Sequence, residues 1–69
     1  MKIFSYTAST IEEVPEKREW IENLGLRIIK EQHIEDSKHV IIVFLIPDEE
    51  TEIMLKLKYG MYTFVDRST

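Results

Sequence analysis

The chain has 69 residues, of which 43% are hydrophobic and none is cysteine, and its formal net charge is −4. This length predicts one domain spanning residues 1–69 with a thin core, and the lack of cysteine excludes disulfides and fits a reducing compartment. The excess of Asp and Glu disfavours binding to nucleic acid or to anionic membranes, which requires basic groups. Residues 40–46 form the longest apolar run, far too short to cross a membrane, and residues 1–6 do not resemble a signal peptide, so we expect a cytoplasmic location.

Three segments have the composition of strands. Residues 2–7 are rich in β-branched and aromatic residues, which is typical of a strand. Residues 26–34 mix β-branched and polar residues, as an outer strand does, and the polar residues 35–38 that follow predict a hairpin turn. The continuous apolar run at residues 40–46 predicts a central strand.

A helix is expected between the first two strands. Thr10 and Glu13 have the spacing of a capping box, which indicates a helix start. Pro15 would remove a helical hydrogen bond in that helix, and it favours instead a start near Val14, where it falls in the first turn. Gly25 has the place of a C-terminal glycine, so the helix is expected to extend to residue 24. The apolar residues Ile11, Val14, Ile21 and Leu24 lie near one face of this helix, with Trp20 at the border.

Residues 48–59 predict a second helix. Asp48 suits the N-cap, Glu52 and Lys56 form a favourable i,i+4 pair, and Gly60 has the place of a helix end. A strand is the alternative, because apolar and polar residues alternate over residues 53–59. Residues 61–65 predict a final strand, and residues 66–69 predict a frayed polar tail.

The element order β-α-β-β-α-β predicts an α+β ferredoxin-like sandwich, in which four antiparallel strands carry two helices on one face. The first and third strands are central in such a sheet. If residues 52–59 formed a strand instead, the fold would be a β-meander with one helix. In the sandwich one face of the sheet lacks helices, and apolar side chains exposed there would indicate a partner.

One group of residues has side chains that can bind a metal ion. His33, Glu35, Asp36 and His39 surround the predicted hairpin turn, and imidazole and carboxylate groups are legitimate zinc ligands. Zinc sites usually have tighter spacings or include cysteine, so we expect a solvated polar turn and no bound metal. No Ser-His-Asp or Cys-His arrangement is identified, and we therefore expect no catalytic residues, no cofactor and no enzyme activity.

Two acidic runs have a functional and an ordinary interpretation. They could imitate a nucleic-acid backbone toward a basic partner, or they could be solvated helix faces with carboxylates at helix starts. We expect the ordinary interpretation, since Lys17 and Arg18 interrupt the first run. The runs are Glu12, Glu13, Glu16, Glu19 and Glu22, and Asp48, Glu49, Glu50 and Glu52.

Known functions of the ferredoxin-like topology can be compared with the sequence. RNA-recognition modules have a basic signature with glycine and aromatic residues on the third strand, whereas residues 38–45 contain no glycine and one aromatic residue. Copper-carrying domains need a cysteine pair. Acylphosphatase-like domains need a glycine-rich loop with arginine after the first strand, and residues 6–10 contain neither. Amino-acid-sensing ACT domains share the topology and length, so a small-molecule sensor is the alternative function. These domains typically have a glycine in that loop, which this chain lacks, so the match is one of topology only.

The second predicted helix resembles a known group of sequences. The segments Asp48-Glu49-Glu50 and Met54-Leu55-Lys56-Leu57-Lys58-Tyr59-Gly60 are similar to a recurring tail of small bacteriophage proteins, with an acidic helix start and an apolar-Lys-Leu-basic-aromatic-Gly ending. The chain has Leu55 where Phe is common and Tyr59 where Trp is common. The resemblance covers about a fifth of the chain. It implies a phage or prophage origin, hence the host cytoplasm, and favours a helix at residues 48–59.

The sequence therefore predicts a small noncatalytic protein-interaction or regulatory module, such as a phage accessory protein that modulates a host or phage protein. A protein partner is expected, and a homodimer is expected from the thin core. The dimer interface would be the open face of the sheet or the outer strand at residues 26–34, where Lys30 and Glu31 could instead prevent pairing.

Overall fold

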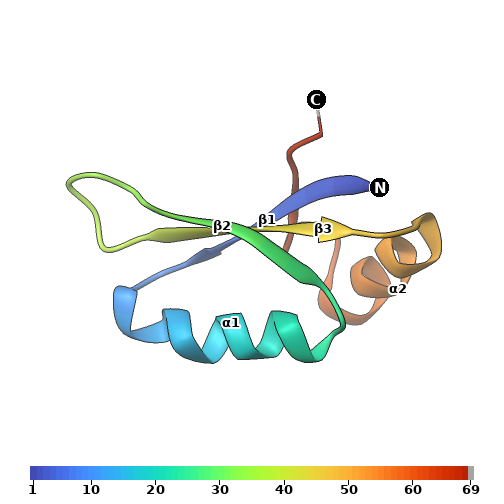
Figure 1. Cartoon of the computed structure of the whole chain (residues 1–69), viewed down its shortest axis with the longest axis horizontal. Coiled ribbons are helices and arrows are strands. Elements are labelled where there is room, and N and C mark those ends of the chain that lie inside the picture. The colour runs from blue at the N-terminus through green and yellow to red at the C-terminus, as the bar shows by residue number, and fades with distance from the viewer. Residues whose placement is uncertain (69) are drawn as a thin grey trace.

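The computed structural model describes residues 1–68, which contain one sheet and two α-helices. Strands and helices follow in the order β-α-β-β-α-β, with one short 3-10 turn before the first helix (Figure 1). The elements are β1 (Lys2–Ala8), η1 (Ile11–Glu13), α1 (Val14–Asn23), β2 (Arg27–His33), β3 (Val40–Ile46), α2 (Glu49–Tyr59) and β4 (Val65–Asp66).

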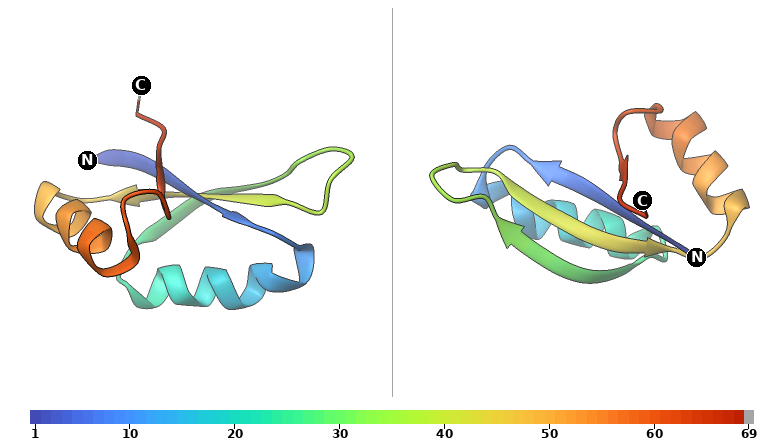
Figure 2. Two further views of the ribbon diagram at one scale, coloured as in Figure 1. Left: turned by 180° about the vertical axis from the view of Figure 1, so that it is seen from behind. Right: turned by 90° about the horizontal axis from the view of Figure 1, so that it is seen from above.

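The sheet is antiparallel throughout and has the strand order β2-β3-β1-β4. This order puts the first and third strands at the centre, which confirms the ferredoxin-like α+β arrangement expected from the sequence. Both helices lie on the same side of the sheet, α1 beneath its centre and α2 toward the end at which β3 finishes (Figures 1 and 2). The opposite face carries no helix, and the C-terminal tail covers it at Ser5.

Strand β3 forms the middle of the core. Its positions 40, 42, 44 and 46 are buried on the helix side, and positions 41, 43 and 45 are half-exposed on the open face. The continuous apolar run is thus a central strand, with one side covered by helices and the other only partly shielded. Other elements complete the core with Phe4, Ala8, Val14, Ile21, Leu26, Leu55 and Phe64.

An aromatic cluster joins the two helices to the sheet. Trp20 of α1 packs against Tyr59 of α2 with ring centroids 5.1 Å apart, and its indole Nε1–H donates to the Tyr59 hydroxyl at 3.3 Å. The rings of Tyr6 and Phe64 each lie 5.4 Å from Trp20. Phe64 also packs edge-on against Phe44 of β3, at 5.5 Å. Such aromatic contacts add to the free energy gained by burial alone.

The start of α1 combines the two starts considered from the sequence. The Thr10–Glu13 capping box forms, with the Glu13 carboxylate accepting from the Thr10 backbone N–H at 3.1 Å, but it caps the 3-10 turn η1 rather than an α-helix. The α-helix then begins at Val14, with Pro15 in its first turn. Ile11 lies in η1 and is half-exposed, so the prediction that it belongs to the apolar face of the helix is wrong. Gly25 follows the helix with φ of 82°, a conformation that favours glycine.

Residues 49–59 form a helix, so the strand alternative is wrong. The Asp48 carboxylate accepts from the Thr51 backbone N–H at 2.8 Å, and hydrogen bonds from Thr51 hold the pKa of Asp48 below its ordinary value. The buried residues of the helix are Glu52 and Leu55, which are three positions apart as a helix requires. The helix ends before Gly60, whose φ is 99°.

Glu52 attaches α2 to the first strand. Its side chain is largely buried, and it binds Lys56 Nζ at 2.8 Å through Oε2 and Lys2 Nζ at 3.1 Å through Oε1. The hydrogen bonds from Lys56 and then from Lys2 hold the pKa of Glu52 below its ordinary value, and the same contact raises the pKa of Lys2. The i,i+4 pair predicted from the sequence is therefore present, and a third group extends it.

The C-terminal part differs from the prediction. The expected final strand is present but covers only Val65–Asp66, so its expected bounds of residues 61–65 are wrong: the chain turns after α2 and Phe64 enters the core. The expected frayed tail at residues 66–69 also differs. Asp66 is in β4 and the Arg67 backbone N–H donates to the Ile3 carbonyl at 2.7 Å, whereas Thr69 lies outside the described residues.

The two helices have 10 and 11 residues. Across residues 1–68, neither they nor any other helical segment has the length and apolar content needed to span a bilayer.

Candidate binding surfaces

The open face of the sheet is made of three rows of side chains that run across the strands. Residues paired across antiparallel strands project from the same face, so the strand register determines the members of each row. Because Phe4 and Phe44 pair on the covered side, the neighbouring pair Ser5 and Val43 lies on the open side. The rows are Gln32–Ile41–Thr7, Lys30–Val43–Ser5–Val65 and Arg27–Leu45–Ile3.

A β-bulge in β2 decides which of its charged residues belong to this face. Arg27 and Ile28 pair with Leu45 and Phe44, but the register then shifts between Ile28 and Lys30. After the shift Lys30 pairs with Val43 on the open side, and Glu31 lies on the helix side. Without the extra residue, strict alternation would place these two charges on the opposite faces.

The charge of the open face differs from that of the whole chain. Its rows contain Arg27 and Lys30 along the β2 edge, and Arg67 lies at the other edge with Nε donating to the Ser5 hydroxyl at 3.0 Å. No Asp or Glu and no aromatic residue is found at the row positions given above. A surface with an apolar centre and basic margins thus exists on a chain of net charge −4.

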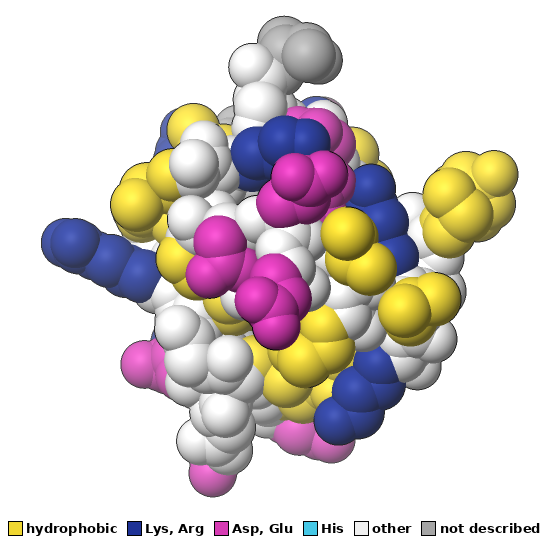
Figure 3. Space-filling model, turned by 90° about the vertical axis from the view of Figure 1, so that its right-hand side faces the viewer, with side chains coloured by type: hydrophobic (Ala, Val, Ile, Leu, Met, Phe, Trp, Pro, Cys, Tyr) yellow, Lys and Arg dark blue, Asp and Glu magenta, His cyan; other side chains and the backbone are white. Residues whose placement is uncertain are grey.

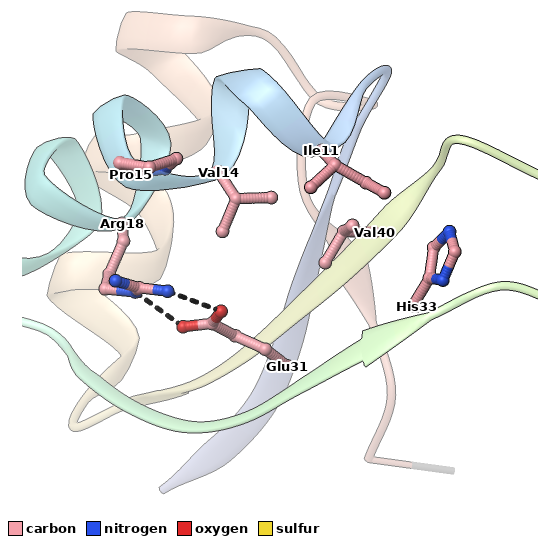
Figure 4. Close-up of a pocket in the computed structure, with 7 residues that line it drawn as sticks. All are labelled: Ile11, Val14, Pro15, Arg18, Glu31, His33 and Val40. Carbon is pink, nitrogen blue, oxygen red and sulfur yellow. Dashed lines mark hydrogen bonds and ion pairs between the residues drawn. The ribbon is translucent and has the colours of Figure 1, made fainter.

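The second candidate surface is a groove of about 380 Å³ between α1 and the hairpin formed by β2 and β3 (Figure 4). Apolar side chains from η1, α1 and β3 form most of its wall, and polar groups come from Arg18, Glu31 and His33. In Figure 4 the Arg18–Glu31 pair lies at one end of the groove and His33 at the other. The lining residues are Ile11, Val14, Pro15, Arg18, Glu31, His33 and Val40.

The ion pair in the groove is bidentate. Arg18 Nε lies 2.6 Å from Glu31 Oε2, and a terminal guanidinium nitrogen lies 2.7 Å from Oε1. The hydrogen bond from Arg18 holds the pKa of Glu31 below its ordinary value, and Glu31 raises the pKa of Arg18. Since Arg18 is on α1 and Glu31 on β2, the pair connects the helix to the outer strand. Much of the charge in the groove is thereby neutralised.

The two histidines among the candidate metal ligands have other partners. Nε2 of His33 lies 2.5 Å from the Ser37 carbonyl, and Nδ1 of His39 lies 2.5 Å from the Ser37 hydroxyl. Within residues 1–68 no three His, Asp or Glu side chains are arranged to hold a metal ion. The predicted turn is present, and Asp36 has φ of 61°, a conformation that Asp tolerates better than most residues.

Sequence reasoning missed two features of these surfaces. The Arg18–Glu31 pair joins residues far apart along the chain, and the bulge that brings them together has no clear local signal. The basic margin of the open face is not evident from the sequence either, because Arg67 lies in the segment for which the sequence predicts a frayed tail.

Comparison of the chain with protein-family models, with curated proteins and with solved structures finds no match. The surfaces described above are therefore the basis for assigning a function.

Proposed function

We propose that this chain is a small noncatalytic protein-interaction module with a regulatory role, which binds another protein through the open face of its sheet. The observation that carries this proposal is the row pattern, with Ile3, Val43 and Leu45 at the centre of an uncovered sheet. Apolar side chains on an exposed sheet gain free energy when a partner covers them. The resemblance of residues 48–60 to small bacteriophage proteins extends the proposal to a phage accessory factor that modulates a host or phage protein.

The margins of the face indicate the kind of protein it fits. Arg27, Lys30 and Arg67 border the apolar centre. A partner segment with apolar side chains flanked by carboxylates would complement this arrangement, and the charges would speed its association. The proposed partner is therefore acidic where it meets the sheet.

The binding face can be tested by capture from a bacterial lysate. We expect the tagged chain to retain one dominant protein, and Val43→Glu to lose it because a carboxylate would enter the apolar centre. Lys30→Glu, which changes only an exposed charge in the same row, should weaken binding about fivefold. Ile53→Glu on α2 is the matched control and should retain the partner. Unchanged capture by both Val43→Glu and Lys30→Glu would contradict the proposal.

Nucleic acid is a poorer partner for this face. Single strands bind open sheets by stacking bases on aromatic rings, and the rows carry none. Tyr6 and Phe44 lie on the helix side of their strands. We expect a dissociation constant above about 10 μM for oligonucleotides at physiological salt, measured by fluorescence anisotropy. A submicromolar value would replace the protein partner by a nucleic acid.

A small-molecule sensor of ACT type is the second candidate function. The groove between α1 and β2 supports it, because its volume of about 380 Å³ lies within the range of ligand pockets and its wall is largely apolar. Thermal shifts with a panel of amino acids and nucleotides would test this function. A shift at micromolar ligand that Arg18→Ala removes would favour the sensor over the interaction module.

Self-association is a further part of the proposal. A chain of 69 residues buries a small core, and a homodimer would bury more apolar surface. Light scattering at increasing protein concentration measures it directly. A mass that stays at 8.2 kDa would contradict it.

A further inference from the structure

The outer surface of α2 is unusually apolar for an exposed helix. Leu57 is 83% exposed, Ile53 51% and Met54 47%. Met61 and Tyr62, which follow the helix, are also exposed. Figure 3 views the end of the molecule at which α2 lies, and hydrophobic side chains there lie beside separate acidic and basic groups.

Helix α1, of nearly the same length, has the ordinary surface of a solvated helix. Its exposed positions include Glu16, Glu19 and Glu22, and within residues 14–23 no large hydrophobic side chain is exposed. The exposed apolar residues of α2 are therefore a property of that helix. They do not follow from the small size of the domain, because Val14 and Ile21 of α1 are buried and Trp20 is partly buried.

The exposed residues of α2 have the spacing of a helix-pairing seam. Glu50, Met54 and Leu57 are separated by four and three positions, which is one heptad of the repeat by which two helices pack along each other, whereas Met61 lies beyond the end of the helix at Tyr59. The ends of this seam have opposite charges, with Glu50 at the start and Lys58 near the finish. Lys56, the other cation of this helix, is bound to Glu52 on the buried side.

We propose that α2 is a self-association surface, on which a second copy of the chain packs its own α2 in antiparallel orientation about a two-fold axis. Such a pair brings Glu50 of each copy toward Lys58 of the other and encloses Met54 and Leu57 between them. Antiparallel packing also aligns the helix dipoles favourably. The proposal rests on the self-association proposed above and is independent of the partner of the open face.

Charge decides between the two surfaces that could hold a second copy. A two-fold interface brings the same surface patch of both copies together, so the patch must complement itself. The open face is bordered by Arg27, Lys30 and Arg67, and two such faces would bring like charges together. The α2 surface carries both signs, at opposite ends, and therefore complements itself. The dimer interface thus differs from both interfaces expected from the sequence.

The size of the seam predicts a weak dimer. An 11-residue helix with a short extension exposes an apolar area on the order of a few hundred Å², less than the roughly 800 Å² per partner of a standard interface. We expect a dissociation constant on the order of 100 μM. Sedimentation of the full chain from about 10 μM to 1 mM covers the transition, and the mass should rise from 8.2 kDa toward twice that value.

Removal of the apolar centre is the first test. Leu57→Ser should abolish the rise in mass, and since this side chain is 83% exposed, the fold measured by circular dichroism should stay unchanged. The control is Val65→Ser on the open face, where the side chain is 46% exposed, and this variant should dimerise as the natural chain does.

Charge exchange is the second test. Glu50→Lys and Lys58→Glu should each weaken the dimer about fivefold, and the double variant Glu50→Lys/Lys58→Glu should restore it. The stability of helix α2 should fall in the double variant while the dimer recovers, because Lys is then near the positive N-terminus of the helix and Glu near its negative C-terminus. Glu19→Lys on α1 makes the same change in net charge as Glu50→Lys and should leave the dimer unaffected.

The outcomes separate this inference from the proposed functions. Recovery of the dimer in the double variant supports antiparallel pairing of α2. A dimer that persists in Leu57→Ser overturns the α2 surface but leaves self-association standing, and a chain that stays at 8.2 kDa up to millimolar concentration overturns both. A lysate protein lost by Leu57→Ser, in the absence of any dimer, would assign the patch to a different partner and also overturn the inference.

Discussion

The two faces of the sheet are built from alternate residues of the same strands, yet they differ in what covers them and in their charge. On the covered face, Phe4, Ile42 and Phe44 pack against two helices, and an aromatic cluster fills the space between the helices. The open face has smaller aliphatic and hydroxyl side chains at its centre and only the C-terminal tail along one margin. The first face holds the fold together, and the second is available to a partner.

The polar groups follow the same division. On the helix side, carboxylates meet cations directly, as in the Arg18–Glu31 and Lys2–Glu52 pairs. Across residues 1–68, Arg27 and Lys30 on the open face have no carboxylate within ion-pair distance. Charges on the covered face thus join the helices to the strands, whereas those on the open face would complement the acidic partner proposed above.

The largest difference in the free energy of unfolding is expected between substitutions at Phe44 and Val43, neighbouring residues of β3 that point to opposite faces. Phe44→Ala should lower the free energy of unfolding by about 3–5 kcal/mol, because it leaves a cavity beneath the helices. Val43→Ala should cost about 1 kcal/mol or less, since this side chain is half-exposed. Urea denaturation followed by Trp20 fluorescence measures both.

The whole stability of a chain this small is about 3–10 kcal/mol, so Phe44→Ala could unfold it. Phe44→Leu, with an expected cost of about 1–2 kcal/mol, then provides the comparison. Equal effects at positions 43 and 44 would mean that the two faces do not differ as described.

The corner that brings the chain from α1 to β2 should be the next most sensitive position. Gly25 has φ of 82° and no other group within 4 Å of where a Cβ would lie, so Gly25→Ala introduces backbone strain without a clash. The expected cost is about 1–2 kcal/mol in the free energy of unfolding. Gly25→Asn should cost less, because Asn tolerates this conformation. A neutral Gly25→Ala would show that α1 is not held under the sheet by this turn.

The contact of Arg67 with Ser5, in the tail that borders the open face, should contribute about 1 kcal/mol to the free energy of unfolding. Arg67→Ala removes the hydrogen bond from Nε to the Ser5 hydroxyl, a group that is fully buried. In a double-mutant cycle with Ser5→Ala, the two losses should be non-additive because they remove one interaction. Additive losses would indicate that the tail does not lie on β1 in solution.

The smallest effect is expected in the pH dependence of stability, through the Arg18–Glu31 pair on the covered face. The hydrogen bond from Arg18 lowers the pKa of Glu31 in the folded chain, so the stabilisation is present above the unfolded value of about 4.3 and is lost as pH falls through the folded pKa. Glu31→Gln cannot titrate, and its melting temperature should fall by a few degrees less between pH 7 and pH 3. Glu19→Gln on the solvated side of α1 is the control and should follow the natural chain.

Much of the fold was predictable because its signals are local. The run at residues 40–46, the turn at residues 35–38 and the cap formed by Asp48 depend on neighbouring residues. Gly25 and Gly60 end helices for the same reason, through their own backbone conformations. These signals were enough to give the element order and, from it, the ferredoxin-like arrangement.

Other features depended on contacts between distant residues. Residues 53–59 fit both a helix and a strand locally, and the burial of Leu55 together with the contact of Tyr59 with Trp20 favours the helix. The last strand is short because Phe64 is needed in the core. The length of the last strand could not be obtained from a window of neighbouring residues, whereas the helix was already favoured locally by the Asp48 cap and by Gly60.

The sequence by itself determined the secondary-structure order, the absence of cysteine, the net charge and the strand that forms the centre of the sheet. Only the tertiary structure decided how the charges are distributed between surfaces. The bulge after Ile28 moves Lys30 to the open face and Glu31 to Arg18, and the pairing of β4 with β1 brings Arg67 to Ser5. The physical reason is that the face on which a strand residue lies depends on register, and register is set by pairing across the sheet rather than by the residue's neighbours in the chain.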